Sequence, residues 1–414
     1  MEEPQPHALY HFTEIEQAGP PARPLEFPPP IVHRGNRVAA LVVVPETGAR
    51  QVLRGVIHRE TSPDTTGGTS TSSTGPSVAY WPQKQLQEAI YGSVWACLVL
   101  RRHHGPAAEE AARAAGVDPC SVAAPIVWEV TNSHVAIKMM VWARIHRMRG
   151  RQLEDPVKEI ACMQLLGSEH PHVLRVMEVL QDDDFLYSVM PYCSGGDLFG
   201  LVVEYAEDEG REGGMSEPMA RYWFRQILSG LHYLQSRGIC HRDLSLENIL
   251  VDHENSLIID MGMCLRVPYN SSSSSTSTTD VSNGTVRRLM RHQGTCGKHN
   301  YMSPEIFKNT EPFDGFGIDL WAAGVILYIM LTGFPPYDQP CLADQRFELI
   351  VNGRLHEQLQ VWEVHVSDEA GDLMQSMLQL DPRQRLTLGE VMKHKWVRNE
   401  DVQPPPREEF DNYH

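Results

Sequence analysis

Apolar residues follow two different spacings along this chain, and the spacing changes after Gly195-Gly196. Before these glycines, short alternating runs predict β-strands with one helix among them, and beyond them spacings of three and four predict mostly helices. The predicted strands are 90–102, 134–145, 172–180 and 185–190, and the predicted helices are 158–166, 220–235, 317–333, 372–380 and 388–396. Strands followed by helices indicate an α+β protein with two lobes.

Two of the predicted helices carry further signals. Asp155 and Pro156 precede KEIACMQLL as an N-cap and a first-turn proline, and Gly167 follows it as a stop. The stretch 320–331 is strongly apolar but is shorter than the roughly 20 residues that span a bilayer. We therefore expect a buried helix there.

The two ends of the chain differ in composition from its middle. Residues 1–78 contain the Pro-rich run PPARPLEFPPP and the tract TSPDTTGGTSTSSTGPS, and we expect an N-terminal extension that is largely disordered or low-complexity. Within it, RVAALVVV is a candidate strand. A second low-complexity tract covers 270–285, and we expect 397–414 to be a flexible tail.

The charge and cysteine content limit the classes of partner and location. The formal net charge is −17, from 53 acidic and 36 basic side chains, which argues against nucleic acid or an anionic membrane as the main partner. The start, MEEPQPHALYHF, lacks a signal-peptide pattern, and the eight cysteines show no CxxC pair. We expect reduced thiols in a cytoplasmic protein, with the nucleus as the alternative location.

Five short motifs occur in an order that suits phosphoryl transfer, which requires a grip on the nucleotide phosphates, metal ions and a carboxylate for the attacking hydroxyl. HVAIK contains Lys138, the helix 158–166 carries Glu159, and HRDLSLEN spans 241–248. IIDMG supplies Asp260, and YMSPE ends at Glu305. Each motif alone has an ordinary structural interpretation, such as a solvated lysine or a turn. Their joint order and spacing favour the catalytic interpretation.

Over residues 85–396 this set resembles the eukaryotic protein kinases. HRDLSLEN lacks the features of tyrosine kinases, and YCSGGDLF and DLWAAGVILYIMLTGFPPYD look most like the calcium/calmodulin-dependent-like group of serine/threonine kinases. The resemblance implies a bilobal fold with a β-rich N-lobe, which carries one main helix, and a helical C-lobe. It also implies transfer of the ATP γ-phosphate, with Mg²⁺, to serine or threonine hydroxyls of proteins. The alternative is a pseudokinase that acts as a scaffold or binding module.

The resemblance also implies roles for individual residues. Asp243 would orient the acceptor hydroxyl, Asn248 and Asp260 would hold Mg²⁺, and Lys138 would pair with Glu159. Asp319 would anchor the catalytic loop, Arg242 would pair with Glu, Asp or phosphate in the activation segment, and Glu305 would pair with Arg385. The residues that would contact ATP are Lys138, Gly92, Val94, Ala136, Met190, Pro191, Cys193 and Asp197.

The sequence departs from the family pattern at two places. QEAIYGSV has Gln87 and Ala89 where the glycine-rich loop has its first two glycines, which would hinder close approach of the backbone to phosphates. Serine/threonine kinases usually have Lys where Ser245 stands and Thr where Lys298 stands. We expect a reciprocal exchange, in which Lys298 supplies the ammonium group near the γ-phosphate and Ser245 supplies the hydroxyl to Asp243. The alternative is two independent losses in a weakened enzyme.

Substrate and regulation are less constrained by the sequence. Asp197, Glu247 and the insertion 204–214 would form an acidic face that prefers basic residues near the acceptor, although a solvated charged loop is an equal alternative. Thr295, and next Thr285, are the candidate phosphorylation sites in the activation segment. The sequence leaves the protein substrate, the upstream activator and the oligomeric state open.

Overall fold

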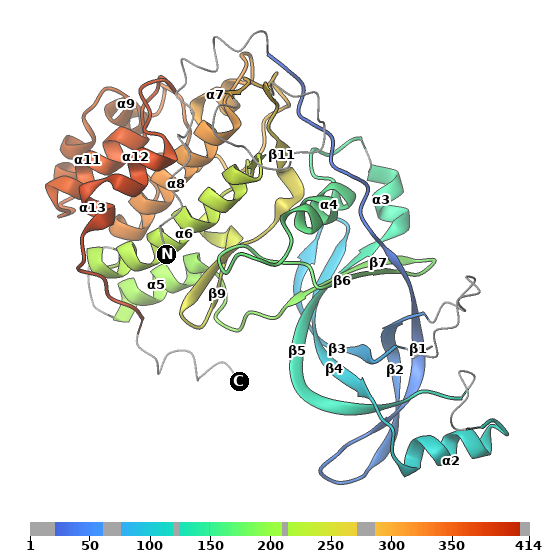
Figure 1. Ribbon diagram of the computed structural model, residues 1–414. Helices are drawn as coiled ribbons and strands as arrows, with labels where there is room; N and C mark the ends of the chain where they lie inside the picture. The colour runs from blue at the N-terminus through green and yellow to red at the C-terminus, as the bar shows by residue number, and fades with distance from the viewer. Residues whose placement is uncertain are drawn as a thin grey trace. The chain divides into compact units, whose positions relative to one another are not determined.

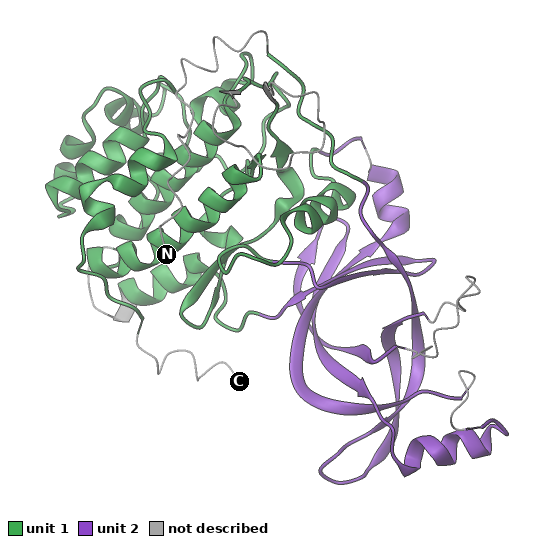
Figure 2. Ribbon diagram, viewed as in Figure 1, with its two compact units in different colours: residues 1–28, 153–174, 193–414 green, residues 29–152, 175–192 purple. Residues whose placement is uncertain are grey.

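The chain forms two compact units, which Figure 2 colours separately. The structure is a computed structural model that describes residues 21–60, 76–118, 124–148, 150–208, 214–270 and 286–405. One unit, residues 29–152 and 175–192, is rich in strands, and the other, residues 1–28, 153–174 and 193–414, is mainly helical. This division confirms the predicted α+β class with a strand-rich and a helical part.

The described strands of the first unit close into a barrel in the order β1-β2-β3-β4-β5-β7-β6 (Figure 1). Closure comes from β1, which pairs with β2 and also runs parallel to β5 and β6. A closed barrel leaves no unpaired strand edge. The elements of this unit are β1 His33–Val43, β2 Arg50–Arg59, β3 Val78–Ala89, β4 Gly92–Arg102, α2 Pro106–Ala114, β5 Val127–Val141, α3 Trp142–Met148, β6 Glu178–Gln181 and β7 Phe185–Pro191.

The long strand β5 gives the barrel an inner and an outer face. Val135, Ile137 and Met139 belong to a buried cluster that includes Tyr187 of β7, so these alternate positions face the core. Successive side chains of a strand point to opposite faces. The positions between them, including Lys138, therefore lie on the outer face.

The strand-rich unit differs from the sequence expectations in three places. Residues 33–59 were included in a largely disordered extension, but they form β1 and β2, which complete the barrel. The candidate strand RVAALVVV is confirmed, since it lies mostly within β1. The predicted strand 134–145 ends at Val141, after which α3 begins. Of the predicted strand 172–180 only residues 178–180 are a regular strand, the start of β6.

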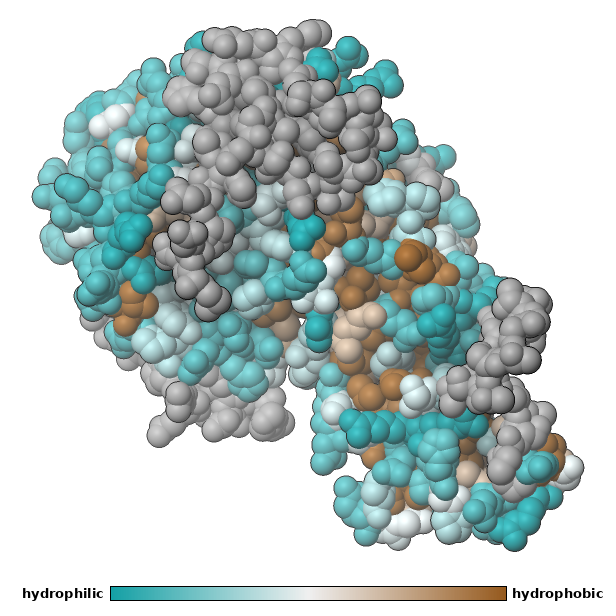
Figure 3. Space-filling view, viewed as in Figure 1, coloured by the Kyte–Doolittle hydropathy of each residue, from teal (hydrophilic) through white to brown (hydrophobic). Residues whose placement is uncertain are grey.

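The helical unit is built around α8, whose residues are all buried. An 18-residue window of this helix is long and apolar enough to cross a membrane by composition, but 94% of the window is buried inside the protein. The expectation of a buried helix at 320–331 is confirmed. Where grey atoms do not cover it, the face of the helical unit seen in Figure 3 is mostly hydrophilic.

The remaining elements of the helical unit surround α8 or form the loops of the candidate site. They are α4 Pro156–Leu166, α5 Leu198–Asp208, α6 Glu217–Ser236, β8 Ile239–Cys240, η1 Leu246–Asn248, β9 Ile249–Asp252, β10 Asn255–Ile258, η2 Met261–Met263, β11 Leu265–Arg266, β12 Tyr269–Asn270, β13 Val286–Arg287, α7 Pro304–Lys308, α8 Gly315–Thr332, α9 Gln345–Val351, α10 Leu355–Val361, α11 Asp368–Met377, α12 Leu388–Lys393 and α13 Lys395–Arg398.

Helix α4 begins and ends where the sequence predicts. The Asp155 carboxylate accepts hydrogen bonds from the backbone N–H groups of Val157 and Lys158, at 2.9 and 3.3 Å. Gly167 ends the helix with a φ of 73°, a conformation that glycine adopts without steric cost.

Candidate active site

The loop 241–248 follows β8 and is anchored by Asp319 of α8. The two carboxylate oxygens of Asp319 accept hydrogen bonds from the backbone N–H groups of His241, at 2.6 Å, and Arg242, at 2.8 Å. Burial raises the pKa of Asp319 to about 6, and it outweighs the lowering by His241 and by the two N–H donors. The prediction that Asp319 anchors this loop is confirmed.

Two non-glycine residues of the site have left-handed backbone conformations. Arg242 has a φ of 70° and Asp260 a φ of 63°. Such conformations are costly for residues with a Cβ atom and concentrate at functional sites. The backbone is therefore strained directly before Asp243 and at Asp260.

Asp243 is held by its own loop through both backbone and side chain. Its N–H donates to His241 Nδ1 at 3.2 Å, and the amide nitrogen of Asn248 lies 2.8 Å from the Asp243 carbonyl oxygen and 3.2 Å from its carboxylate. Since Nδ1 of His241 accepts, its Nε2 donates to the Ile259 carbonyl oxygen at 2.8 Å. The imidazole thus bridges the loop and the residue preceding Asp260, a role that the sequence analysis did not assign to His241.

The charge state of Asp243 depends on several neighbours. Burial raises its pKa, and the nearby Asp260 raises it further, whereas His241, Lys298 and the Asn248 hydrogen bond lower it. The pKa of the Asp243 carboxyl group is therefore set by contributions of opposite sign. Raised basicity suits a group that accepts a proton from a hydroxyl.

Asn248 and Asp260 are the candidate metal ligands. One Asp260 oxygen accepts from the Gly262 N–H at 3.1 Å, and the Ile259 N–H donates to the Asn248 carbonyl oxygen at 3.0 Å, which connects the two segments. The Asn248 amide nitrogen is used by Asp243, which leaves the amide oxygen for a cation. The described residues contain no cluster of three or more His, Cys, Asp or Glu side chains that could hold a metal ion. Two oxygen donors still fit Mg²⁺, which is usually bound by one or two carboxylates together with substrate phosphates.

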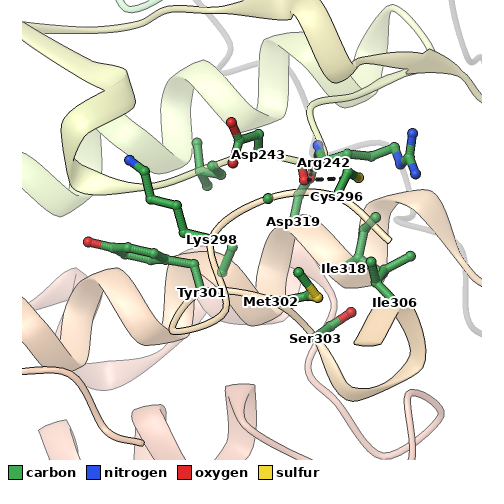
Figure 4. A pocket seen from close by; sticks show the side chains of 13 residues that line it. Arg242, Asp243, Cys296, Lys298, Tyr301, Met302, Ser303, Ile306, Ile318 and Asp319 are labelled. Atoms are coloured by element: carbon green, nitrogen blue, oxygen red, sulfur yellow. Dashed lines mark hydrogen bonds between the residues drawn. The ribbon is translucent and has the colours of Figure 1, made fainter. Parts of the chain in front are cut away.

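Lys298 lines the same pocket as Asp243 (Figure 4) and connects the end of the activation segment to the catalytic loop. Its ammonium group donates to the Ser245 hydroxyl at 3.0 Å and forms an ion pair with Glu247, also at 3.0 Å. Ser245 is fully buried, whereas the side chains of Lys298 and Glu247 are about two-fifths and one-third exposed. The structure thus brings together the two residues that depart from the family pattern.

The Glu247 carboxylate is held in its charged form and is paired with Lys298. Although burial raises its pKa, its own backbone N–H, Lys298 and the hydroxyl of Tyr301 outweigh that effect and lower it. The neighbouring carboxylate and burial together raise the pKa of Tyr301. Figure 4 shows Tyr301 beside Lys298, with the polar ends of both side chains on the same side of the pocket. The Lys298 ammonium group therefore offsets the charge that Glu247 would bring to an acidic face.

Gly297 is a site residue that the sequence analysis missed. A Cβ atom at this position would lie 3.2 Å from the Arg242 carbonyl oxygen and 3.3 Å from an Asp243 carboxylate oxygen, and the φ of Gly297 is 87°. The segment before Lys298 therefore passes close to the catalytic loop because it has no side chain there. The glycine in the motif CGKHNY, residues 296–301, was the sequence feature that could have identified this position.

The activation segment, 260–305, is held at several points among its described residues. The Arg242 guanidinium donates to the carbonyl oxygens of Met263, at 3.4 Å, and Gly294, at 3.1 Å. Its described partners are thus backbone oxygens of the activation segment and not the Glu, Asp or phosphate expected from the sequence. Thr295, the first candidate phosphorylation site, is exposed and directly follows Gly294. The second candidate, Thr285, lies outside the described residues.

The predicted pair of Glu305 and Arg385 is confirmed. The guanidinium donates to both Glu305 oxygens, at 2.8 and 3.3 Å, and also to the Gly317 carbonyl oxygen at 2.7 Å. The Arg385 side chain is 1% exposed and lies over the Trp321 ring. This pair ties the end of the activation segment to α8.

The residues expected to contact ATP fall in both units. Glu159, the expected partner of Lys138, is buried on α4, which packs against η2 within the helical unit. In the same unit, the Asp197 carboxylate accepts from the Gly200 N–H at 2.9 Å and so caps α5. Burial raises the pKa of the Cys193 thiol to about 12, so this thiol stays protonated. Any contact that Cys193 makes with the nucleotide would therefore come from its backbone.

In the strand-rich unit, the expected nucleotide residues share the outer face of the barrel. Val94 of β4 pairs with Lys138 of β5, and Ala136 of β5 pairs with Met190 of β7. Lys138 is 8% exposed. Positions two apart on a strand and their cross-strand partners lie on one face. Pro191 follows at the end of β7.

Strand packing explains why position 92 is a glycine, without any role in phosphate binding. A Cβ atom on Gly92 would lie 1.8 Å from the Met139 carbonyl oxygen, so the backbones of β4 and β5 approach closely there. The hairpin turn before it is packed inward, because Tyr91 is 1% exposed and its carbonyl oxygen accepts from the Val141 N–H at 2.9 Å. Glycine is required at position 92 whether or not a nucleotide is bound.

Comparison with known families agrees with this geometry. The family model described as "Protein kinase domain" matches residues 120–397. The chain belongs to the protein kinase family. The bilobal protein kinase fold expected from the sequence is thereby confirmed, and the match begins after β3 and β4, the strands that flank the degenerate glycine-rich loop.

Several curated kinases resemble the chain across this domain. It is 30% identical to CBL-interacting protein kinase 17 of Oryza sativa subsp. japonica over 290 residues, which cover 68% of the chain and 55% of the relative. A probable serine/threonine-protein kinase of Dictyostelium discoideum is 32% identical over 58% of the chain and 25% of the relative. The serine/threonine-protein kinase SIK3 homolog of Danio rerio is 30% identical over 68% and 20%. The chain thus spans about half or less of the length of these relatives.

Proposed function

We propose that this chain is an active serine/threonine protein kinase that transfers the γ-phosphoryl group of ATP to hydroxyl groups of protein substrates. The arrangement around Asp243 carries the proposal. Its carboxylate is fixed by Asn248, its backbone is fixed by His241 and the loop anchored on Asp319, and its basicity is raised by burial and by Asp260. A positioned carboxylate of this kind orients the acceptor hydroxyl and takes its proton.

Lys298 and Ser245 supply the groups beside Asp243. Lys298 presents a cation at the catalytic loop, where it would stabilise the charge of the transferring phosphoryl group. The Ser245 oxygen accepts from Lys298, which leaves its own proton to donate to the Asp243 carboxylate. The reciprocal exchange expected from the sequence is supported by this contact, because the two chemical groups are preserved although their positions are transposed.

Asn248 and Asp260 would hold Mg²⁺ through their oxygen atoms. When bound, the metal neutralises charge on the nucleotide phosphates. We assign Lys138, on the outer face of the barrel, to the α and β phosphates by analogy with the family. Because Gly92 is explained by strand packing, phosphate binding would depend more on Lys138 than on the degenerate glycine-rich loop.

Serine/threonine specificity is supported by the names of the curated relatives, two of which are called serine/threonine-protein kinases. The preference for basic residues near the acceptor is less well supported, since Lys298 offsets the charge of Glu247 and Asp197 caps α5. A neutral or mixed sequence around the acceptor fits this site better than a strongly basic one.

The function is tested by transfer of radiolabelled γ-phosphate to a generic protein substrate, with the full chain beside its Asp243→Asn variant. We expect transfer by the wild type and a loss of roughly 100-fold or more in the variant. Binding of Mg–ATP, measured as a rise in Tm, serves as the control and should persist in the variant. A wild type that binds Mg–ATP but transfers no phosphate would contradict the proposal and support the pseudokinase alternative.

A further inference from the structure

Residues 21–27 lie along the activation segment, although their Pro-rich sequence predicted no structure. Ala22 forms a parallel bridge with Met290, and Leu25 forms an antiparallel bridge with Arg266. Figures 1 and 2 show this stretch as the blue start of the described chain and as part of the helical unit. The segment therefore touches the activation segment at two points that are far apart in sequence.

Three backbone hydrogen bonds form these contacts. The Ala22 N–H donates to the Leu289 carbonyl oxygen at 2.9 Å, and the Arg291 N–H donates to the Ala22 carbonyl oxygen at 3.0 Å. The Leu25 N–H donates to the Arg266 carbonyl oxygen at 2.9 Å. Backbone atoms make the bonds, as they do when a strand is added to a sheet, but here they form two isolated bridges and no regular strand.

Two arginines of the activation segment reach back to the same stretch. Arg266 donates from its guanidinium to the Glu26 carbonyl oxygen at 2.5 Å and lies over the Phe27 ring at 6.0 Å. Arg291 donates from Nε to the Pro21 carbonyl oxygen at 3.3 Å. Contacts from both sides thus fix residues 21–27 at each end.

The first contact point leads directly to the catalytic loop. Leu265 and Arg266 form β11, which pairs with Ile239 and Cys240 of β8. His241 follows β8 immediately and carries the hydrogen bond to Asp243. A segment that holds Arg266 therefore supports the start of the catalytic loop.

The second contact point lies in the packed part of the activation segment. Met290 exchanges two backbone hydrogen bonds of 2.9 Å with Phe313 and is fully buried beside Cys240. The backbone at Met290 thus lies between Ala22 on one side and Phe313 on the other. Four residues after Met290, the Gly294 carbonyl oxygen accepts the hydrogen bond from Arg242.

The contacts do not obstruct the site. None of residues 21–27 lines the pocket that contains Asp243, Lys298 and Tyr301 (Figure 4). We propose that residues 21–27 are an intramolecular strap that positions the activation segment by pairing with it at two separate points, Arg266 and Met290. The catalytic part of this inference rests on the proposed function, whereas the ordering of the segment does not.

The test removes the two N–H donors of the strap in the full chain. Ala22→Pro with Leu25→Pro deletes both donors, because proline has no N–H. Arg23→Pro is the matched control, since the Arg23 N–H donates no hydrogen bond to the described part of the chain. Amide hydrogen exchange over 286–292 reports ordering, and kcat and KM for a generic substrate report catalysis.

We expect the double variant to exchange faster over 286–292 and to lose roughly three- to tenfold in kcat with little change in KM for ATP. The control should match the wild type in both measurements. Equal exchange in all three proteins would overturn the strap, whether or not they are active. Faster exchange with an unchanged kcat would also overturn it, because the stretch would then dock without positioning. A wild type without activity contradicts only the proposed function, and the exchange data then decide the strap.

Discussion

Lys298 donates a hydrogen bond of 3.0 Å to the hydroxyl group of Ser245, and its ammonium group also lies 3.0 Å from the Glu247 carboxylate. Serine/threonine kinases usually have a lysine and a threonine at these two positions in the opposite order. The contact therefore keeps an ammonium and a hydroxyl group beside Asp243 while exchanging the segments that supply them. A site that had lost two residues independently has no reason to bring the replacements into contact.

The exchange can be tested by transposing the two residues. Lys298→Thr alone should lower kcat by about 100-fold, because the cation is lost from the site. Adding Ser245→Lys should return part of that activity, so the effects of the two substitutions on kcat should be strongly non-additive. Steady-state kinetics of the two single variants and the double variant measure this coupling. A double variant whose loss equals the product of the single losses would show that the two positions act independently.

The same lysine controls the pH dependence of Asp243. Burial raises the pKa of Asp243 and the Lys298 charge lowers it, so Lys298→Thr should raise it further. Asp243 must be ionised to accept a proton, and activity is lost as the pH falls through its pKa. We therefore expect the acid limb of the kcat/KM profile to move to higher pH in the variant. An acid limb at the wild-type position would mean that Lys298 does not act on this carboxylate.

The close approach of Gly297 to the catalytic loop predicts a difference between two glycine substitutions. Gly297→Ala and Gly353→Ala both place a side chain at a positive φ, 87° and 77°, at a cost of about 1–2 kcal/mol. Only at Gly297 does the new Cβ meet Arg242 and Asp243, since nothing lies within 4 Å at Gly353. Both variants should lose similar stability in urea, but only Gly297→Ala should lose kcat, by about tenfold. Equal kcat values in the two variants would contradict the contact.

The parts of the site that could be predicted from the sequence are those set by side-chain chemistry at fixed spacing. Asp319 was expected to hold the catalytic loop, and Glu305 was expected to pair with Arg385, and both contacts are present. In each case the residue type and its place in a motif indicated the partner. Asp155 at the start of α4 is predictable in the same way.

Structure formed through backbone atoms could not be predicted in this way. Residues 21–27 pair through the N–H and carbonyl groups of Ala22 and Leu25, so their side-chain pattern carries no sign of it. Strand β2 contains Gly55 at a φ of 76°, and the register of its pairing with β1 shifts between Val38 and Ala40. This irregularity breaks the alternation of inward and outward side chains by which a strand is predicted. Gly92 was attributed to phosphate binding because close packing against β5 leaves no mark in the local sequence.

The Glu305–Arg385 pair predicts a large difference between two neighbouring arginines. Arg385→Ala removes the partner of a largely buried carboxylate and should lower the free energy of unfolding by about 3–5 kcal/mol. Arg383 pairs with Asp381, but half of its side chain is exposed, so Arg383→Ala should cost about 1 kcal/mol or less. Urea denaturation of both variants measures the difference. Similar losses would show that the buried pair adds little to stability.

Asp319 makes the stability of the fold depend on pH. Its pKa rises from 3.8 to about 6 on folding, because burial disfavours the charged form. A carboxyl group with a raised pKa in the folded state binds its proton more tightly there, so its contribution to stability is greatest at low pH and is lost as the pH rises through the folded pKa. Asp319→Asn removes this titration.

The free energy of unfolding of the wild type minus that of Asp319→Asn should therefore fall by about 2 kcal/mol from about pH 4 to about pH 7. Taking the difference cancels the other titrating groups, and urea denaturation at several pH values supplies it. The variant also loses one acceptor for the N–H groups of His241 and Arg242, but that loss does not depend on pH. A difference that is constant or rises with pH would show that the two N–H donors and His241 stabilise the Asp319 charge enough to cancel the effect of burial.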